Sequence, residues 1–227
     1  MGTLAEGTHG VYKPKGVTSH DVIAILRRTT GIKKIGHAGT LDPLASGLLV
    51  VGIGREATRR LNKEVGKEKE YKALVRLGVT STTDDEEGEK EVISAVTPPL
   101  LSSIEAVVHT FVGNIEQTPP IYSAVKIKGK PAHRLVRKGK KVELKPREVL
   151  IKSIEIVEYS WPFLELKVIT GPGVYIRSLA RDIGEKLGTG AYLAELERTR
   201  VGEYTKEKAL SLESVAGELL FDKRRKE

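Results

Sequence analysis

The segment from residue 36 to residue 47 reads Gly36-His37-Ala38-Gly39-Thr40-Leu41-Asp42-Pro43-Leu44-Ala45-Ser46-Gly47, with one acid among three glycines and a proline. Because Pro43 follows it, Asp42 is disfavoured in the helical region and favours an extended backbone. The apolar run at residues 48–53 comes next and is typical of a buried strand. The segment predicts a carboxylate held on a shaped loop before a core strand, although an ordinary Asp-Pro turn has the same pattern.

Apolar residues recur at helical spacing before this loop and alternate with polar residues after it. Thr18, Ser19 and Asp21 form an N-cap pattern, after which apolar residues recur at helical spacing until Gly31. A polar helix is expected at about residues 56–63. At residues 69–77 the apolar side chains alternate, which predicts a half-buried strand with Tyr71 on its apolar face.

The second half of the chain mixes strand and helix patterns. A helix is expected from Ser102 or Ser103, and strands at 149–159 and 163–169 are expected to form an antiparallel pair. The clearest helix follows Gly173 and ends before Gly188, and two more helices are expected at 191–196 and 212–220. This irregular order predicts an α+β fold, with a mixed, largely antiparallel sheet flanked by helices.

Composition narrows the class of protein. The chain has 227 residues, of which 39% are hydrophobic and 30% charged, so a single domain is the default expectation. It has no cysteine, its five histidines lack metal-ligand spacing, and no metal site is expected. No apolar run approaches the roughly 18 residues of a membrane span, and the N-terminal residues do not resemble a signal peptide, so a cytoplasmic protein is predicted.

Positive charge is concentrated between residues 126 and 147, where ten lysines and arginines accompany one glutamate. Since the whole chain has a net charge of +8, the remainder is close to neutral. A solvated loop is one interpretation, and a phosphate-binding arm with at most one short helix, at 132–138, is the other. The candidate phosphate contacts are Lys126, Lys128, Arg134, Lys138, Lys140 and Lys141.

Several motifs, in order, resemble the TruB family of pseudouridine synthases. The central segment is similar to the family's G-H-x-G-x-L-D-P motif. The flanking matches are Lys13-Pro14-Lys15-Gly16, Lys69-Glu70-Tyr71-Lys72, Gln117-Thr118-Pro119-Pro120, Gly173-Val174-Tyr175-Ile176-Arg177 and Leu196-Glu197-Arg198. The resemblance covers about residues 10–205.

The resemblance implies a pseudouridine synthase-like fold and conversion of uridine to pseudouridine at position 55, in the T loop of transfer RNA. It places Asp42 on the essential aspartate, Tyr71 on the active-site tyrosine and Arg177 on the arginine that pairs with the aspartate. The target uridine must leave its stack to be reached. The resemblance implies that His37 supports this flipping and that Tyr175 and Leu196 line the pocket.

The same resemblance identifies residues 117–148 as an inserted RNA-binding thumb within one catalytic domain, residues 1–227, without the C-terminal PUA domain of many members. A monomer that binds the T stem-loop and uses no cofactor is expected. Gly52-Ile53-Gly54 lacks the third glycine and the acid of a dinucleotide site. A non-catalytic RNA-folding module, and a synthase acting on another structured RNA, are the alternatives.

Overall fold

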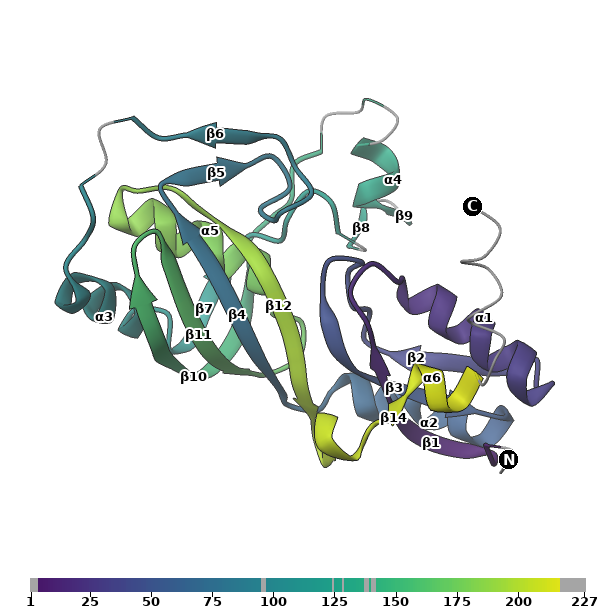
Figure 1. Cartoon of the computed structure of the whole chain (residues 1–227). Helices are drawn as coiled ribbons and strands as arrows, with labels where there is room; N and C mark the ends of the chain where they lie inside the picture. Colours follow the sequence, from purple (N-terminus) through teal and green to yellow (C-terminus); the bar gives the residue numbers. More distant parts are fainter. Residues whose placement is uncertain are drawn as a thin grey trace, which may run out of the picture. The chain divides into compact units, whose positions relative to one another are not determined.

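The computed structural model of the chain describes residues 4–94, 97–123, 125–127, 129–136, 139 and 142–216. The chain divides into two compact units, Met1–Tyr71 with Leu196–Glu227, and Lys72–Glu195. Strands β4 (Lys69–Leu77) and β12 (Ala191–Val201) have residues in both units. The elements are labelled in Figure 1. No helix in the described ranges combines the length and apolar character that a membrane crossing needs.

The first unit is built on a mixed sheet, with strand order β14-β1-β3-β12 and with β2 paired to β3 and β13 to β12. Strand β1 is antiparallel to β3 but parallel to β14, and β3 is parallel to β12. Besides β12, the strands of this sheet are β1 (Gly7–Lys13), β2 (Ile35–Ala38), β3 (Ser46–Ile53), β13 (Tyr204–Thr205) and β14 (Leu210–Ser211).

Helix α1 (Ser19–Thr30) has the boundaries that its sequence predicts. The Thr18 hydroxyl accepts a hydrogen bond from the Asp21 backbone N–H, and the Asp21 carboxylate accepts one from the Thr18 N–H, which completes a capping box. The helix ends at Gly31, whose left-handed conformation suits glycine. Among the described residues the unit also contains α2 (Arg55–Val65), η1 (Lys206–Lys208) and α6 (Leu212–Ala216).

Strand β3 is buried on both faces, which explains its unbroken apolar sequence. Leu49, Val51 and Ile53 pack in one cluster with residues of α1, including Val22 and Leu26. Leu48 and Val50 belong to a second cluster with Leu61 of α2 and Val201 of β12. Since each face of the strand meets its own set of apolar partners, alternation is absent, as predicted for residues 48–53.

The second unit contains the strand order β12-β4-β11-β10-β7 and a separate β5–β6 hairpin. Strand β10 is antiparallel to both of its neighbours. Helix α3 (Leu101–His109) packs against α5 (Ile176–Leu187), and Figure 1 shows both beside the sheet. The other strands are β5 (Val79–Ser81), β6 (Lys90–Val92), β7 (Gly113–Gln117), β10 (Arg147–Ser160) and β11 (Phe163–Thr170).

The α+β prediction is confirmed, but the helix expected at residues 191–196 is wrong because these residues begin strand β12. Ala191, Tyr192, Leu193 and Ala194 are all buried, so both faces of the strand are apolar there. A short continuous apolar run does not distinguish a buried strand from a buried helix. The last expected helix is present as α6, and its predicted continuation to residue 220 lies outside the described residues.

Candidate active site

The loop between β2 and β3 carries Asp42, and glycines shape both of its ends. Gly39 has a φ of 80° and Gly47 a φ of 108°, in the region that side chains disfavour. At Gly47 a Cβ atom would lie 2.3 Å from the carbonyl oxygen and 2.6 Å from the nitrogen of Arg198. Gly47 is therefore required by the close approach of β12 as well as by its own backbone conformation.

Contacts from the preceding segment hold the loop on either side of Asp42. The buried Ser19 hydroxyl accepts a hydrogen bond from the Leu41 N–H at 2.9 Å and donates one to the Leu41 carbonyl at 3.0 Å. The Gly16 N–H donates to the Pro43 carbonyl at 2.7 Å, and the Asp42 carbonyl accepts from the Ala45 N–H at 3.1 Å. The residues immediately before and after Asp42 are thus fixed independently.

Lys13 is a buried cation beside this loop. Its Nζ donates hydrogen bonds to the carbonyls of Pro14, Val17 and Ala45, at 3.0, 2.6 and 2.5 Å. Burial lowers the pKa of Lys13 to about 8, while the negative charge of Asp42 acts in the opposite direction. All three ammonium donors are used on the backbone, so Lys13 supports the loop and adds positive charge near Asp42.

Arg198 is a second buried cation of the same unit. Its Nε donates to the Leu48 carbonyl at 2.8 Å and its Nη2 to the Gly39 carbonyl at 3.0 Å. Burial lowers the pKa of Arg198, and the Tyr71 hydroxyl and then the Asp42 carboxylate act against this shift. The first unit therefore brings Asp42 and Tyr71 to one guanidinium group.

Tyr71 lies on the buried face of β4 with Ala73, Val75 and Leu77, as the alternation predicts. Lys69, two residues before it, is also buried, and its Nζ donates to the carbonyls of Val65 and Lys67. Burial lowers the pKa of Lys69 to about 8, with a further lowering by the charge of Arg198. Lys69 is thus a buried cation close to Arg198, which itself interacts with Tyr71 and Asp42.

His37 lies on β2, at the start of the same loop. Burial lowers its pKa, and the nearby charges of His20 and Arg198 lower it further, so the ring is neutral near pH 7. The ring of His20 is 5.9 Å away in an edge-on arrangement. The Nδ1 of His37 is buried without a hydrogen-bond partner among the described residues. A neutral ring of this kind suits contact with a base better than contact with a phosphate.

Arg177 belongs to the second unit, where it lies in the first turn of α5. Its Nη1 donates to the Asp85 carboxylate and to the Thr83 carbonyl, each at 3.2 Å, and its Nη2 donates to the Tyr122 carbonyl at 3.0 Å. Both side chains of the Arg177–Asp85 ion pair are buried. Asp42 belongs to the first unit, so the expected pairing of Asp42 with Arg177 stays a prediction.

Tyr175 precedes α5 and is held through its backbone. Its N–H donates to the Gln117 side-chain oxygen at 2.8 Å, and its carbonyl accepts from the Gln117 side-chain nitrogen at 3.1 Å. The Arg147 guanidinium lies 5.2 Å from the centre of the Tyr175 ring. Leu196 is half-buried on the part of β12 that belongs to the first unit.

The expected thumb contains the short strands β8 (Lys126–Ile127) and β9 (Lys130–Pro131) and the helix α4 (Ala132–Val136). The prediction of one short helix near residues 132–138 agrees with α4. Of the candidate phosphate contacts, Lys128, Lys138, Lys140 and Lys141 lie outside the described residues. For Lys126 and Arg134 only the backbone is described, so the role of all six stays a prediction.

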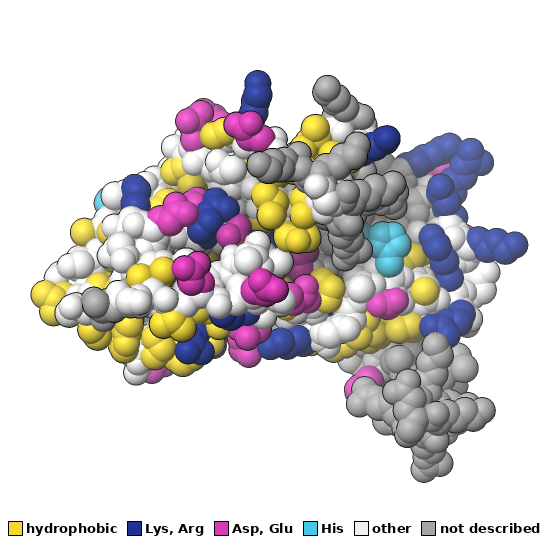
Figure 2. Space-filling view, turned by 90° about the horizontal axis from the view of Figure 1, so that it is seen from above, with side chains coloured by type: hydrophobic (Ala, Val, Ile, Leu, Met, Phe, Trp, Pro, Cys, Tyr) yellow, Lys and Arg dark blue, Asp and Glu magenta, His cyan; other side chains and the backbone are white. Residues whose placement is uncertain are grey.

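Another basic surface lies at the end of α1. Arg27 and Arg28 in its last turn and Lys33 and Lys34 after it are all exposed. Figure 2 shows Lys and Arg side chains gathered where α1 lies.

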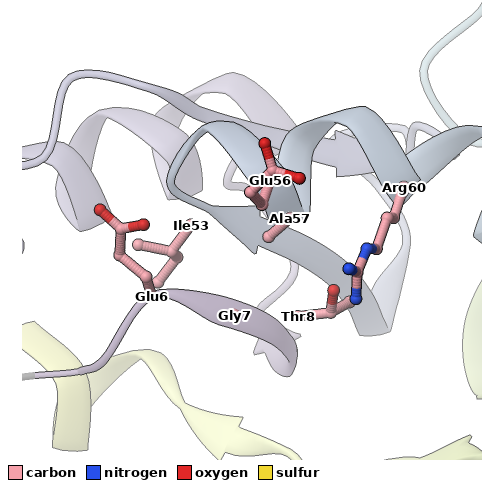
Figure 3. A pocket seen from close by; sticks show the side chains of 7 residues that line it. All are labelled: Glu6, Gly7, Thr8, Ile53, Glu56, Ala57 and Arg60. Carbon is pink, nitrogen blue, oxygen red and sulfur yellow. The ribbon is translucent and has the colours of Figure 1, made fainter.

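A pocket in the same unit, shown in Figure 3, is lined by Glu6, Gly7, Thr8, Ile53, Glu56, Ala57 and Arg60. Two carboxylates against one guanidinium make that pocket a poor phosphate site.

Sequence reasoning gave no role to Lys13 or Arg198, although both stand in motifs that carry the resemblance. A lysine at the end of a predicted strand is expected to be exposed to solvent. Only the fold shows that the Lys13 ammonium donates to three backbone carbonyls. Arg198 follows the helix wrongly expected at residues 191–196, so its place on strand β12 was not predicted. Gly47 was the available signal, because a glycine next to a buried strand often marks close backbone approach.

Two family models match the chain. The model for the N-terminal domain of TruB family pseudouridylate synthases matches residues 27–176. The chain belongs to the TruB family. The model for the C-terminal domain of tRNA pseudouridylate synthase B matches residues 177–227. Since Arg177 is the first residue of the second match, the TruB-family matches continue one another along the sequence.

Curated relatives in the TruB family align with most of the chain. The tRNA pseudouridine synthase B of Corynebacterium diphtheriae is 46% identical over 90% of this chain and 70% of its own length. That of Thermobifida fusca is 44% identical over 95% of this chain and 76% of its own length. At this identity and coverage, these relatives support the family assignment over nearly the whole chain.

Solved structures share the fold. A chain in a Cbf5-Nop10-Gar1 complex has a TM-score of 0.73 at 31% identity, covering 96% of this chain and 56% of that one. A chain in an H/ACA RNP bound to a substrate RNA containing 2'-deoxyuridine has a TM-score of 0.70 at 29% identity, covering 96% and 55%. The present chain thus spans a little over half the length of these solved chains.

Proposed function

We propose that this TruB-family chain converts uridine to pseudouridine in transfer RNA, at position 55 of the T loop. The observation that carries the proposal is the Asp42 loop, which presents one carboxylate near two buried cations, Lys13 and Arg198. These positive charges lie beside the carboxylate that the reaction needs. The names of the curated relatives support transfer RNA as the substrate.

The isomerisation breaks the bond between N1 of uracil and C1′ of ribose and forms a bond between C5 and C1′. The proton leaves C5 and one is gained at N1, so atoms balance without a redox partner, and the proposal includes no cofactor. Asp42 assists either by attacking the sugar or by acting as a base on it. The Tyr71 ring stacks on the base, and its phenol takes part in moving the C5 proton.

The remaining expected residues complete the proposal. Arg177 pairs with Asp42, His37 supports flipping of the uridine, and Tyr175 and Leu196 line the pocket for the flipped base. The thumb lysines and arginines bind phosphates of the T stem. The chain acts as a monomer in the cytoplasm, where its substrate is found.

The test is to map pseudouridines in total RNA from cells with and without this chain, and in a purified T-stem-loop RNA treated with it. The expected result is one pseudouridine at position 55 of the T loop that depends on the chain. A chain-dependent site in another RNA would contradict the proposed target. The absence of any new pseudouridine in either RNA would contradict the proposed reaction and favour a non-catalytic RNA-binding role.

A further inference from the structure

Arg198 stands out because its charge is buried more completely than its direct partners explain. It is 1% exposed and among the largest fully buried side chains of the described residues. Two of its hydrogen bonds go to the neutral carbonyls of Leu48 and Gly39. Burying a guanidinium against neutral partners is costly, and the fall in its pKa reflects that cost.

The residue holds both ends of the Asp42 loop. Its side chain binds the Gly39 carbonyl at the start of the loop, and its backbone pairs in register with Gly47 at the end. The contact at Gly47 is close enough that a Cβ atom there would overlap the Arg198 backbone. A displacement of Arg198 therefore moves the segment that carries Asp42 from both sides.

The same guanidinium is hydrogen-bonded to the Tyr71 hydroxyl and lies near the Asp42 carboxylate. A guanidinium group has donors and no acceptor, so the phenol oxygen accepts and its own hydrogen points away from Arg198. The contact therefore restricts the directions open to the hydroxyl hydrogen. Lysine cannot match this arrangement, because a point charge lacks the planar set of donors.

We propose that Arg198 is a positioning residue that ties the Asp42 loop to the Tyr71 hydroxyl, so that carboxylate and phenol meet the target uridine in one fixed arrangement. This inference rests on the proposed function, in which Asp42 and Tyr71 act on the same nucleotide. It assigns Arg198 no contact with the RNA. Its substitution should therefore change the rate of the chemical step more than the affinity for RNA.

A double-mutant cycle tests the inference. We expect Arg198→Lys to lower kcat by roughly 10- to 100-fold, because small misplacements of reacting groups have effects of this size. KM should stay within about threefold. In a Tyr71→Phe background the same substitution should cost at least about fivefold less, because the hydroxyl it positions is gone. Arg200→Lys, two residues further along β12, is the matched control and should keep the activity of the parent chain.

Multiplicative effects of Arg198→Lys and Tyr71→Phe on kcat would overturn the inference, as would a loss confined to KM. A second measurement needs no turnover, namely the NMR spectrum of chain labelled with ¹³Cζ-tyrosine, in which the Tyr71 signal is identified by its loss in Tyr71→Phe. Arg198→Lys should shift this signal, and an unchanged signal would overturn the inference. If Arg198→Lys does not fold, the ¹⁵Nε signal of Arg198 is compared between the parent chain and Tyr71→Phe. A shift supports the inference, and an unchanged signal would overturn it. An inactive parent chain would instead count against the proposed function.

Discussion

At the residue scale, Asp42 lies on a loop that neighbouring groups hold in place. Ser19 fixes the residue before it, Gly16 the residue after it, and Lys13 the end of the turn. The sequence identified Asp42 from its unusual setting and its resemblance to a family motif. The residues that support it could not be identified in this way, because each acts through the backbone of a segment distant in sequence.

Ser19→Ala should destabilise the chain, because it leaves the buried N–H and carbonyl of Leu41 without the partners that Ser19 supplies. We expect a loss of about 1–3 kcal/mol in the free energy of unfolding, measured by urea denaturation, and a lower kcat. Ser102→Ala, at an exposed position of α3, is the control and should change stability by less than about 0.5 kcal/mol. Equal stability of the two variants would contradict the account of the loop.

Lys13 gives the stability a specific pH dependence. Its pKa is about 8 in the folded chain against 10.5 for the free side chain, so the unfolded state binds more protons between these values. The contribution of Lys13 to the free energy of unfolding should therefore rise as the pH increases from 8 to 10.5, by at most about 3 kcal/mol. Urea denaturation over this range should show the stability of the parent chain rising relative to that of Lys13→Met. The difference between the two narrows if the variant is the more stable at pH 8 and widens if the parent chain is. Parallel curves would contradict the prediction.

At the element scale, the structure is predicted well where caps and periodicity agree. Helix α1 follows its capping box, and β4 follows its alternation. The failure at β12 has a physical cause, since burial of both faces removes the alternation that distinguishes a strand. The local sequence pattern also does not indicate which strands pair, because the parallel pairing of β12 with β3 joins residues about 150 positions apart.

Gly47→Ala should be far more damaging than the same change at another glycine with positive φ. At Gly47 the new Cβ atom would meet the Arg198 backbone, whereas at Gly31 it would meet no atom within 4 Å. We expect Gly31→Ala to cost only its backbone strain, about 1–2 kcal/mol. Thermal unfolding and tritium release should show Gly47→Ala to be both less stable than Gly31→Ala and inactive. Comparable stabilities would show that β12 does not press on Gly47.

The contact between α5 and the turn before β6 depends on charge. Arg181 Nη1 donates to the Asp84 carboxylate at 2.8 Å, and burial raises the pKa of Asp84 while Arg181 opposes the shift. Arg181→Met should destabilise the chain by about 2 kcal/mol at pH 7, because it leaves a partly buried carboxylate without this partner. Since the pKa of Asp84 would rise further in the variant, the deficit should shrink as the pH falls toward 4. A deficit independent of pH, measured by denaturation at several pH values, would contradict this assignment.

At the scale of the whole molecule, charge and family membership support the proposed function. The excess of lysine and arginine at residues 126–147 was evident from the sequence, and α4 agrees with the short helix expected there. The pairing of Asp42 with Arg177 was not derivable from composition or periodicity. It requires the placement of two segments in different units, and it enters through the resemblance alone.

Binding of the T-stem-loop RNA should weaken steeply with salt if the thumb contacts phosphates. Changing Lys138, Lys140 and Lys141 to Gln should reduce the slope of log K against log salt by about two, because each lost phosphate contact removes roughly 0.7–0.9. The matched control changes Arg28, Lys33 and Lys34 to Gln, which removes the same charge from the end of α1. A larger reduction of the slope in the control than in the thumb variant would place the phosphate contacts at the end of α1 and contradict the role of the thumb.

The catalytic role of Asp42 is tested most directly by tritium release from C5-labelled uridine in a T-stem-loop RNA, measured for the parent chain and for Asp42→Asn. We expect the parent chain to release tritium and Asp42→Asn to be slower by roughly 10⁴-fold or more, with RNA affinity changed by less than about threefold. Glu213→Gln, which removes an exposed carboxylate from α6, should match the parent chain. Full activity of Asp42→Asn would contradict a catalytic role for this carboxylate.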